Sequence, residues 1–124
     1  MSGSINSLSI DIGSKSLDAL WERSNAISNN IANYDTPGYQ QQSVSFEDQL
    51  SSALQDNNIT SSELSQINPT VVTQPGSSSP DGAGVDMEEQ MVELMRNQLQ
   101  YNYVERGVSD SLDLLRSAAS EGRK

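Results

Sequence analysis

The 124-residue sequence contains no cysteine and no histidine. Disulfides, thiol catalysis and zinc–thiolate sites are therefore excluded, and the most common general base and metal ligand of proteins is missing as well. Carboxylates are plentiful, but those near Asp86 fall in an expected first helical turn, where a capping role explains them. We therefore expect no enzyme, no metal site and no cofactor.

Apolar and aromatic residues are also scarce, at 34% and 5% of the chain. Globular domains usually contain about 45–50% apolar residues when glycine is counted. The shortage is greatest in the middle of the sequence, so the core must come from the two ends. A chain this poor in apolar residues either stays partly disordered alone or completes its core with partners.

Positive charge is the third scarcity. The net charge is −10, and no Lys or Arg lies between Arg23 and Arg96. This balance disfavours binding to nucleic acid or to anionic lipid, and solubility is a sufficient explanation of the acidity. No stretch approaches the roughly 18–20 apolar residues that a membrane-spanning helix needs.

The N-terminal third of the chain is predicted to form a helix after an irregular lead-in. Residues 1–13 show no clear period, whereas over residues 14–35 apolar side chains recur at alternating spacings of three and four. The positions in this row are Leu17, Leu20, Ser24, Ile27, Ile31 and Tyr34, with Trp21 widening the apolar surface. The polar side carries Asn and Ser in place of charges. It is either a solvated surface or a set of amides that hydrogen-bond to other subunits.

The segment Thr36-Pro37-Gly38 ends this helix. Pro37 lacks the N–H that a continuing helix needs, and Gly38 permits the positive φ of a type II turn.

The middle of the chain, residues 36–84, is predicted to hold this turn, a short helix and a flexible loop and linker. Residues 39–45 read as extended, and the short helix is expected over 46–55 with Ser45 as its cap. Within the loop, Val71-Val72-Thr73 favours a short extended piece, and residues 76–84 have the composition of a linker.

The longest predicted helix covers residues 85–120. Asp86 and Glu89 have the spacing of a capping box at its start. Apolar residues again follow the three–four spacing, and the row consists of Met87, Met91, Leu94, Gln98, Tyr101, Glu105, Val108, Leu112, Leu115 and Ala119. Gly107 costs about 1 kcal/mol relative to Ala inside a helix, so it marks either a bend or the close approach of another backbone.

The expected fold is therefore mainly α. The N- and C-terminal amphipathic helices pack as an antiparallel coiled-coil-like pair, with a short helix and a long irregular loop region between them, and the whole forms one domain.

Two stretches resemble a known family. Ser28-Asn29-Asn30-Ile31-Ala32-Asn33 followed by Asp35-Thr36-Pro37-Gly38-Tyr39 resembles the N-terminal signature of bacterial flagellar axial proteins, which include rod, hook and hook-associated proteins. The segment from Gly84 to Leu94, continued by Asn97-Gln98-Leu99-Gln100-Tyr101-Asn102, is similar to the C-terminal helix of short proximal rod proteins.

This resemblance implies a structural subunit of the proximal rod of the flagellar basal body, which self-assembles helically through its terminal helices and connects the membrane ring to the rest of the rod. The implied partners are copies of itself, other flagellar rod proteins, the adaptor and ring proteins at the rod base, and the flagellar type III export apparatus. The implied location is the basal body, after export across the cytoplasmic membrane into the periplasm or cell-wall space. A second short proximal rod protein, or a soluble helical adaptor or binding module, remains an alternative.

We predict an assembly interface that combines the two apolar rows, the amide-rich surface and the turn. Its residues are Leu17, Leu20, Trp21, Ile27, Asn29, Asn30, Ile31, Asn33, Tyr34, Pro37, Gly38, Tyr39, Met91, Leu94, Gln98, Tyr101, Val108, Leu112 and Leu115. Among them, the amides of Asn29, Asn30 and Asn33 and the turn are assigned to contacts between subunits. Ile27, Ile31 and Tyr34 are assigned to the seam within one subunit.

Overall fold

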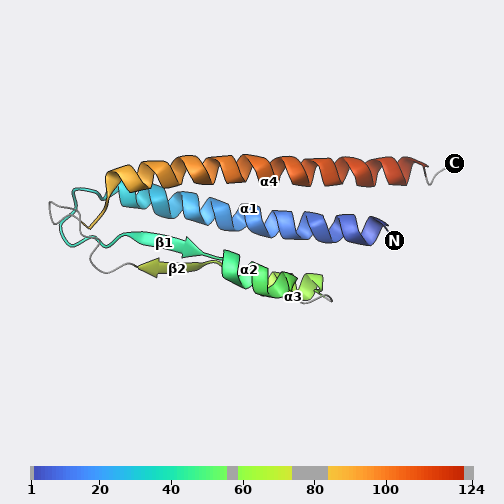
Figure 1. The fold of residues 1–124 in the computed structure, drawn as a ribbon, viewed down its shortest axis with the longest axis horizontal. Coiled ribbons are helices and arrows are strands. Elements are labelled where there is room, and N and C mark those ends of the chain that lie inside the picture. The colour runs from blue at the N-terminus through green and yellow to red at the C-terminus, as the bar shows by residue number, and fades with distance from the viewer. Residues whose placement is uncertain (1, 56–58, 74–83, 122–124) are drawn as a thin grey trace.

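The computed structural model describes residues 2–55, 59–73 and 84–121. In chain order, its elements are α1 (Ser2–Ala32), β1 (Gln42–Ser45), α2 (Glu47–Leu54), α3 (Ser61–Ser65), β2 (Thr70–Thr73) and α4 (Met87–Glu121). The long helices α1 and α4 run antiparallel and side by side, and the short elements form a thinner layer against α1 (Figure 1). The mainly α fold with packed terminal helices is therefore confirmed.

Helix α1 begins earlier and ends earlier than the sequence predicted. The irregular lead-in over residues 1–13 is wrong, because almost all of this stretch is helical. Gly13 lies so close to α4 that an added Cβ would overlap the side chain of Val108, and Ile12 is half-buried. Packing on α4 therefore orders a segment whose own sequence has no strong helical period.

The turn after α1 was predicted correctly. Gly38 has a φ of +76°, and the Tyr39 N–H donates to the carbonyl of Thr36 at 3.2 Å. These are the features of a type II turn, which redirects the chain into β1.

A two-stranded antiparallel ribbon follows the turn, with Val44 of β1 opposite Val71 of β2. The sequence predicted the two extended pieces but not their pairing. The expected cap on the next helix is wrong, because Phe46 occupies the N-cap position of α2 with no side-chain hydrogen bond. The Phe46 side chain is instead buried beneath α1, where it packs with Ala19 and Leu20 in the hydrophobic core.

Helix α3 lies in a segment for which the sequence predicted an irregular loop. The Thr60 hydroxyl accepts from the Glu63 N–H at 3.2 Å, and the Thr60 N–H donates to the Glu63 carboxylate at 2.9 Å. This reciprocal capping box stabilises the first turn. The buried side chains of Leu64 and Ile67 hold the segment in place, and α3 contacts α1. Of the predicted linker over 76–84, only Gly84 falls within the described residues.

Helix α4 begins at Met87, close to the predicted start at residue 85, and Asp86 Oδ1 accepts from the Glu89 N–H at 3.2 Å as the predicted cap. Its packed row is displaced, however. The buried and half-buried positions that form the row are Met87, Gln90, Leu94, Asn97, Tyr101, Val104, Val108, Ser111 and Leu115. The predicted row is correct at every second position and wrong at the others, where the exposed residues are Met91, Gln98, Glu105, Leu112 and Ala119. A Cβ added to Gly107 would have nothing from the rest of the described chain within 4 Å, so no other backbone lies close on that side.

Candidate assembly site

The amide of Asn30 connects α1 to three other segments of the subunit. Asn30 is fully buried, and its Nδ2 donates to the Gln42 carbonyl at 2.7 Å and to Gln90 Oε1 at 2.8 Å. Its Oδ1 accepts from the Gln42 N–H at 2.9 Å and from the Tyr39 hydroxyl at 3.1 Å. All hydrogen-bonding capacity of this amide is therefore used to join α1, the turn, β1 and α4.

Two further contacts connect the turn to the start of α4. The Asp86 N–H donates to Gln41 Oε1 at 3.3 Å, and Gln41 is buried. A Cβ on Gly84 would overlap the Tyr39 carbonyl oxygen, so glycine is required there for the two backbones to meet. Burial raises the pKa of the Tyr39 hydroxyl, which keeps it protonated as a hydrogen-bond donor at neutral pH. The signature segment therefore organises the inside of this end of the subunit.

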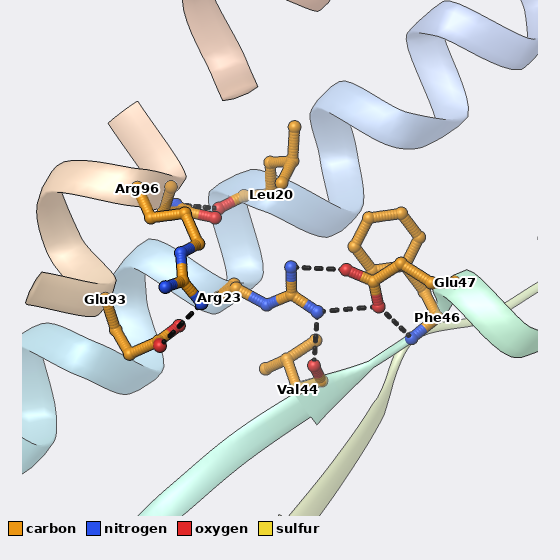
Figure 2. A network of polar contacts seen from close by, with 8 residues as sticks. Leu20, Arg23, Val44, Phe46, Glu47, Glu93 and Arg96 are labelled. Atoms are coloured by element: carbon orange, nitrogen blue, oxygen red, sulfur yellow. Dashed lines mark hydrogen bonds and ion pairs between the residues drawn. The ribbon is translucent and has the colours of Figure 1, made fainter. Parts of the chain in front are cut away.

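Arg23 joins α1 to the start of α2 (Figure 2). Its guanidinium donates at 2.7 Å to both the Val44 carbonyl and Glu47 Oε2, and it lies over the Phe46 ring at 4.9 Å. Partial burial alone would raise the pKa of the Glu47 carboxyl. The hydrogen bond and charge of Arg23, with two backbone amides, outweigh this and lower that pKa below its ordinary value. These contacts hold β1 and the start of α2 against α1.

The seam between α1 and α4 contains a second buried amide. Asn97 Nδ2 donates to the Leu20 carbonyl at 2.9 Å, while its Oδ1 has no hydrogen-bond partner among the described residues. With Gln90, this places two polar side chains in the packed row of α4, and buried amides of this kind select one register between helices at some cost in stability.

The face of α4 opposite this row is apolar and exposed. Its members are Val92, Met95, Leu99 and Tyr103, which are 53%, 68%, 70% and 82% exposed. They recur at spacings of three, four and four, so they form one stripe along the helix. We call these four residues the outer stripe of α4. The outer stripe was not predicted from the sequence, because a single apolar row was expected on this helix.

The predicted interface residues divide into two groups. Most apolar members are buried or half-buried in the subunit: Leu17, Leu20, Ile27, Ile31, Leu94, Tyr101, Val108 and Leu115. The exposed members are Trp21, Asn29, Tyr34, Pro37, Gly38, Met91, Gln98 and Leu112, with Asn33 and Tyr39 half-buried. Two assignments need correction. Asn30 is enclosed in its own subunit and not offered to a neighbour, and Tyr34 lies beyond the end of α1, 42% exposed, outside the seam.

Within residues 2–55, 59–73 and 84–121, no three acidic side chains come close enough to hold a metal ion. In the same ranges, no helix is both long enough and apolar enough to cross a membrane.

The fold is that of a small helical structural protein. Its two long terminal helices are joined at one end by the buried hydrogen bonds of Asn30, and the outer stripe of α4 is left exposed. Residues 10–40 match the family of flagella basal body rod proteins. The chain is 30% identical over 105 residues to the flagellar basal body rod protein FlgB of Bacillus subtilis, covering 78% of this chain and 81% of that relative. It is 32% identical over 111 residues to FlgB of Borreliella burgdorferi, covering 76% and 82%.

The chain belongs to the FlgB family of flagellar basal body rod proteins. It is therefore a structural protein of the flagellar basal body, and it assembles with other components of the rod. Between the two short proximal rod proteins that the sequence left open, these relatives favour FlgB.

Proposed function

We propose that the chain self-assembles helically through its terminal helices as a subunit of the proximal rod, and that it connects the membrane ring to the rest of the rod. The specific partners in this proposal are copies of itself, the adaptor and ring proteins at the rod base, and the export apparatus that delivers the subunit. In the same proposal, the subunit is first exported across the cytoplasmic membrane and then assembles.

The outer stripe of α4 is the observation that carries self-assembly. One side of the helix already packs on α1 through a row that includes Gln90 and Asn97, yet the opposite side exposes larger apolar side chains. Fully burying each such side chain contributes about 1.5–3 kcal/mol. A contiguous exposed apolar stripe of this kind marks a contact with another macromolecule. A chain with so small a core gains stability when neighbours cover it.

Deletion of the gene is the first test of the rod function. We expect the deletion strain to lack filaments and to be non-motile, because a rod without its proximal subunit cannot support the structures beyond it. Normal motility of the deletion strain would refute the proposal.

Substitutions on the two sides of the helix pair separate assembly from folding. Leu99→Asp places a charge on the outer stripe, so we expect an unchanged monomer and loss of rod assembly. Leu94→Asp and Ile27→Asp place a charge in the packed seam, so we expect both to destabilise the subunit itself. The measurements are thermal melts by circular dichroism and recovery of each variant in isolated basal bodies. Ser52→Asp on the exposed surface of α2 is the control and should change neither.

A further inference from the structure

The chain has four methionines and no cysteine, so thioethers are the only sulfur groups that an oxidant can meet. Met1 lies outside the described residues, and Met87 is half-buried in the packed row of α4. Met91 and Met95 are 52% and 68% exposed, so both side chains are open to solvent in the subunit. Exposure is what makes a sulfur-containing side chain susceptible to oxidation, and Met95 is the most exposed methionine of α4.

Met95 belongs to the outer stripe of α4, and the helix surface around it is largely apolar. Residues three and four positions apart are neighbours on a helix surface. The exposed neighbours of Met95 at these spacings are Met91, Val92, Gln98 and Leu99. Gln98 is the polar one, and its Nε2 already donates to Asn102 Oδ1 at 3.1 Å. Arg96, next in the chain, already pairs with Glu93. The surface around Met95 therefore offers little hydrogen bonding to a new polar group.

We propose that Met95 is a reversible oxidation site that controls whether a free subunit can enter the rod. Hydrogen peroxide transfers one oxygen atom to the Met95 sulfur: the O–O bond breaks, an S=O bond forms and water leaves. The sulfur loses two electrons and the peroxide gains them. A thiol-dependent methionine sulfoxide reductase reverses the change, releasing water and oxidising two thiols to a disulfide. This inference rests on the proposed self-assembly and adds a control of the same surface.

Oxidation of Met95 has different consequences for folding and for assembly. The side chain is mostly exposed in the subunit, so its sulfoxide stays hydrated and the fold is unchanged. When a neighbouring subunit covers the outer stripe, the sulfoxide oxygen leaves water with few donors beside it, and burial of a polar group without hydrogen bonds is unfavourable. Oxidised subunits should therefore enter rods at least about tenfold less often than reduced ones.

The fate of oxidised wild-type chains tests the proposal directly. In a strain without methionine sulfoxide reductase, newly made chains are labelled with heavy isotopes, exposed to a short peroxide pulse before they assemble, and followed through a peroxide-free chase. Glu-C protease cleaves after glutamate, so the methionines of α4 fall in separate peptides, 64–88, 90–93 and 94–105. Mass spectrometry should find the Met95 sulfoxide at least about tenfold enriched in unassembled chains over isolated basal bodies. Equal fractions in the two pools would overturn the inference while leaving the rod function intact.

Matched substitutions test whether Met95 is the responsible site. The readout is the number of rods per cell with peroxide relative to the number without it, in the same strain. This ratio should fall about tenfold in the wild type and in the control Met91→Leu, which both retain Met95, but not in Met95→Leu. Met95→Gln carries a permanent polar group, so it should keep the thermal melt of the wild type and lose rods.

Two results of the substitutions would overturn the inference. One is a peroxide sensitivity of Met95→Leu equal to that of the wild type, and the other is a normal number of rods in Met95→Gln. If Met95→Leu forms no rods of its own, the labelled wild-type chains decide the matter. A motile deletion strain would instead refute the rod function itself.

Discussion

Asn30 illustrates how a single side chain fixes the geometry of an entire end of the molecule. Its amide bonds β1 through two contacts, α4 through Gln90 and the turn through Tyr39. The Nδ2 donates to two oxygens and the Oδ1 accepts from two donors, a pattern that neither a carboxylate nor an aliphatic side chain reproduces.

We therefore predict that Asn30→Asp lowers the free energy of unfolding by about 3–4 kcal/mol, because a buried carboxylate would face the carbonyl of Gln42 and the oxygen of Gln90. Urea unfolding of the purified chain measures this loss. Asn29→Asp, at the exposed neighbouring position, should change stability by less than about 0.5 kcal/mol. Equal losses in the two variants would show that burial of Asn30 is not the cause.

Glu47 provides a pH-dependent contribution. Its pKa is lowered in the folded chain, so its contact with Arg23 stabilises the fold above the ordinary carboxyl pKa of 4.5 and is lost as the pH falls through the lowered value. The Glu47 side chain is half exposed, so solvent screening limits the effect to about 1 kcal/mol or less. Glu47→Gln should therefore be less stable than the wild type at about pH 7, with the difference shrinking at about pH 3. Urea unfolding at both values checks this, and a difference independent of pH would contradict it.

At the scale of elements, two glycines in helices have opposite roles. Gly13 of α1 allows close approach to Val108 of α4, whereas Gly107 of α4 is exposed with open space around it. Gly13→Ala should lower the melting temperature, since repacking around an added methyl group costs about 1–3 kcal/mol. Gly107→Ala should raise it, because Ala is better than Gly in a helix by about 0.5–1 kcal/mol. Thermal melts of the two variants test this pair, and a stabilising Gly13→Ala would show that the helices do not approach there.

The main part of α1, helices α2 and α4, the turn and the extended pieces were predictable from the sequence, because they depend on local signals such as the Pro37-Gly38 pair and the cap at Asp86. The packed row of α4 was only half predictable. Apolar periodicity favoured Met91 over Gln90, but Gln90 has a partner in Asn30, which is 60 residues away in the chain. A polar residue that is buried because of a distant partner gives no signal in an apolar pattern.

Other parts were missed for related reasons. The Thr60 and Glu63 capping box was a readable signal for α3, but the surrounding polar composition favoured a loop. The pairing of β1 with β2 joins segments about 28 residues apart, for which local propensity carries no information. At the candidate site, the sequence could not decide which faces of the two long helices the subunit already uses, and it assigned the buried amide of Asn30 to a neighbouring subunit.

At the scale of the whole molecule, α4 is longer than α1, the helix on which it packs. It runs past the start of α1, and residues 116–121 are all exposed (Figure 1). The Arg116–Asp113 contact there, at 4.0 Å between two exposed side chains, adds little. Among the residues that the structure describes, the final turns of α4 thus have no partner that buries them, and isolated helical turns are marginal in water.

We therefore expect amide hydrogen exchange to divide α4 in two. In dilute subunits, amides of residues 116–121 should exchange rapidly, while those around Asn97 and Tyr101, which pack on α1, should be protected. In isolated basal bodies, amides of the final turns should become protected from exchange, because neighbouring subunits cover them. Leu99→Asp subunits, which are expected not to assemble, should not gain this protection. Exchange measured by mass spectrometry on both samples makes the comparison. Rapid exchange of the final turns in the basal body would mean that assembly leaves this end of α4 uncovered, and would confine the contacts between subunits to the region of the outer stripe.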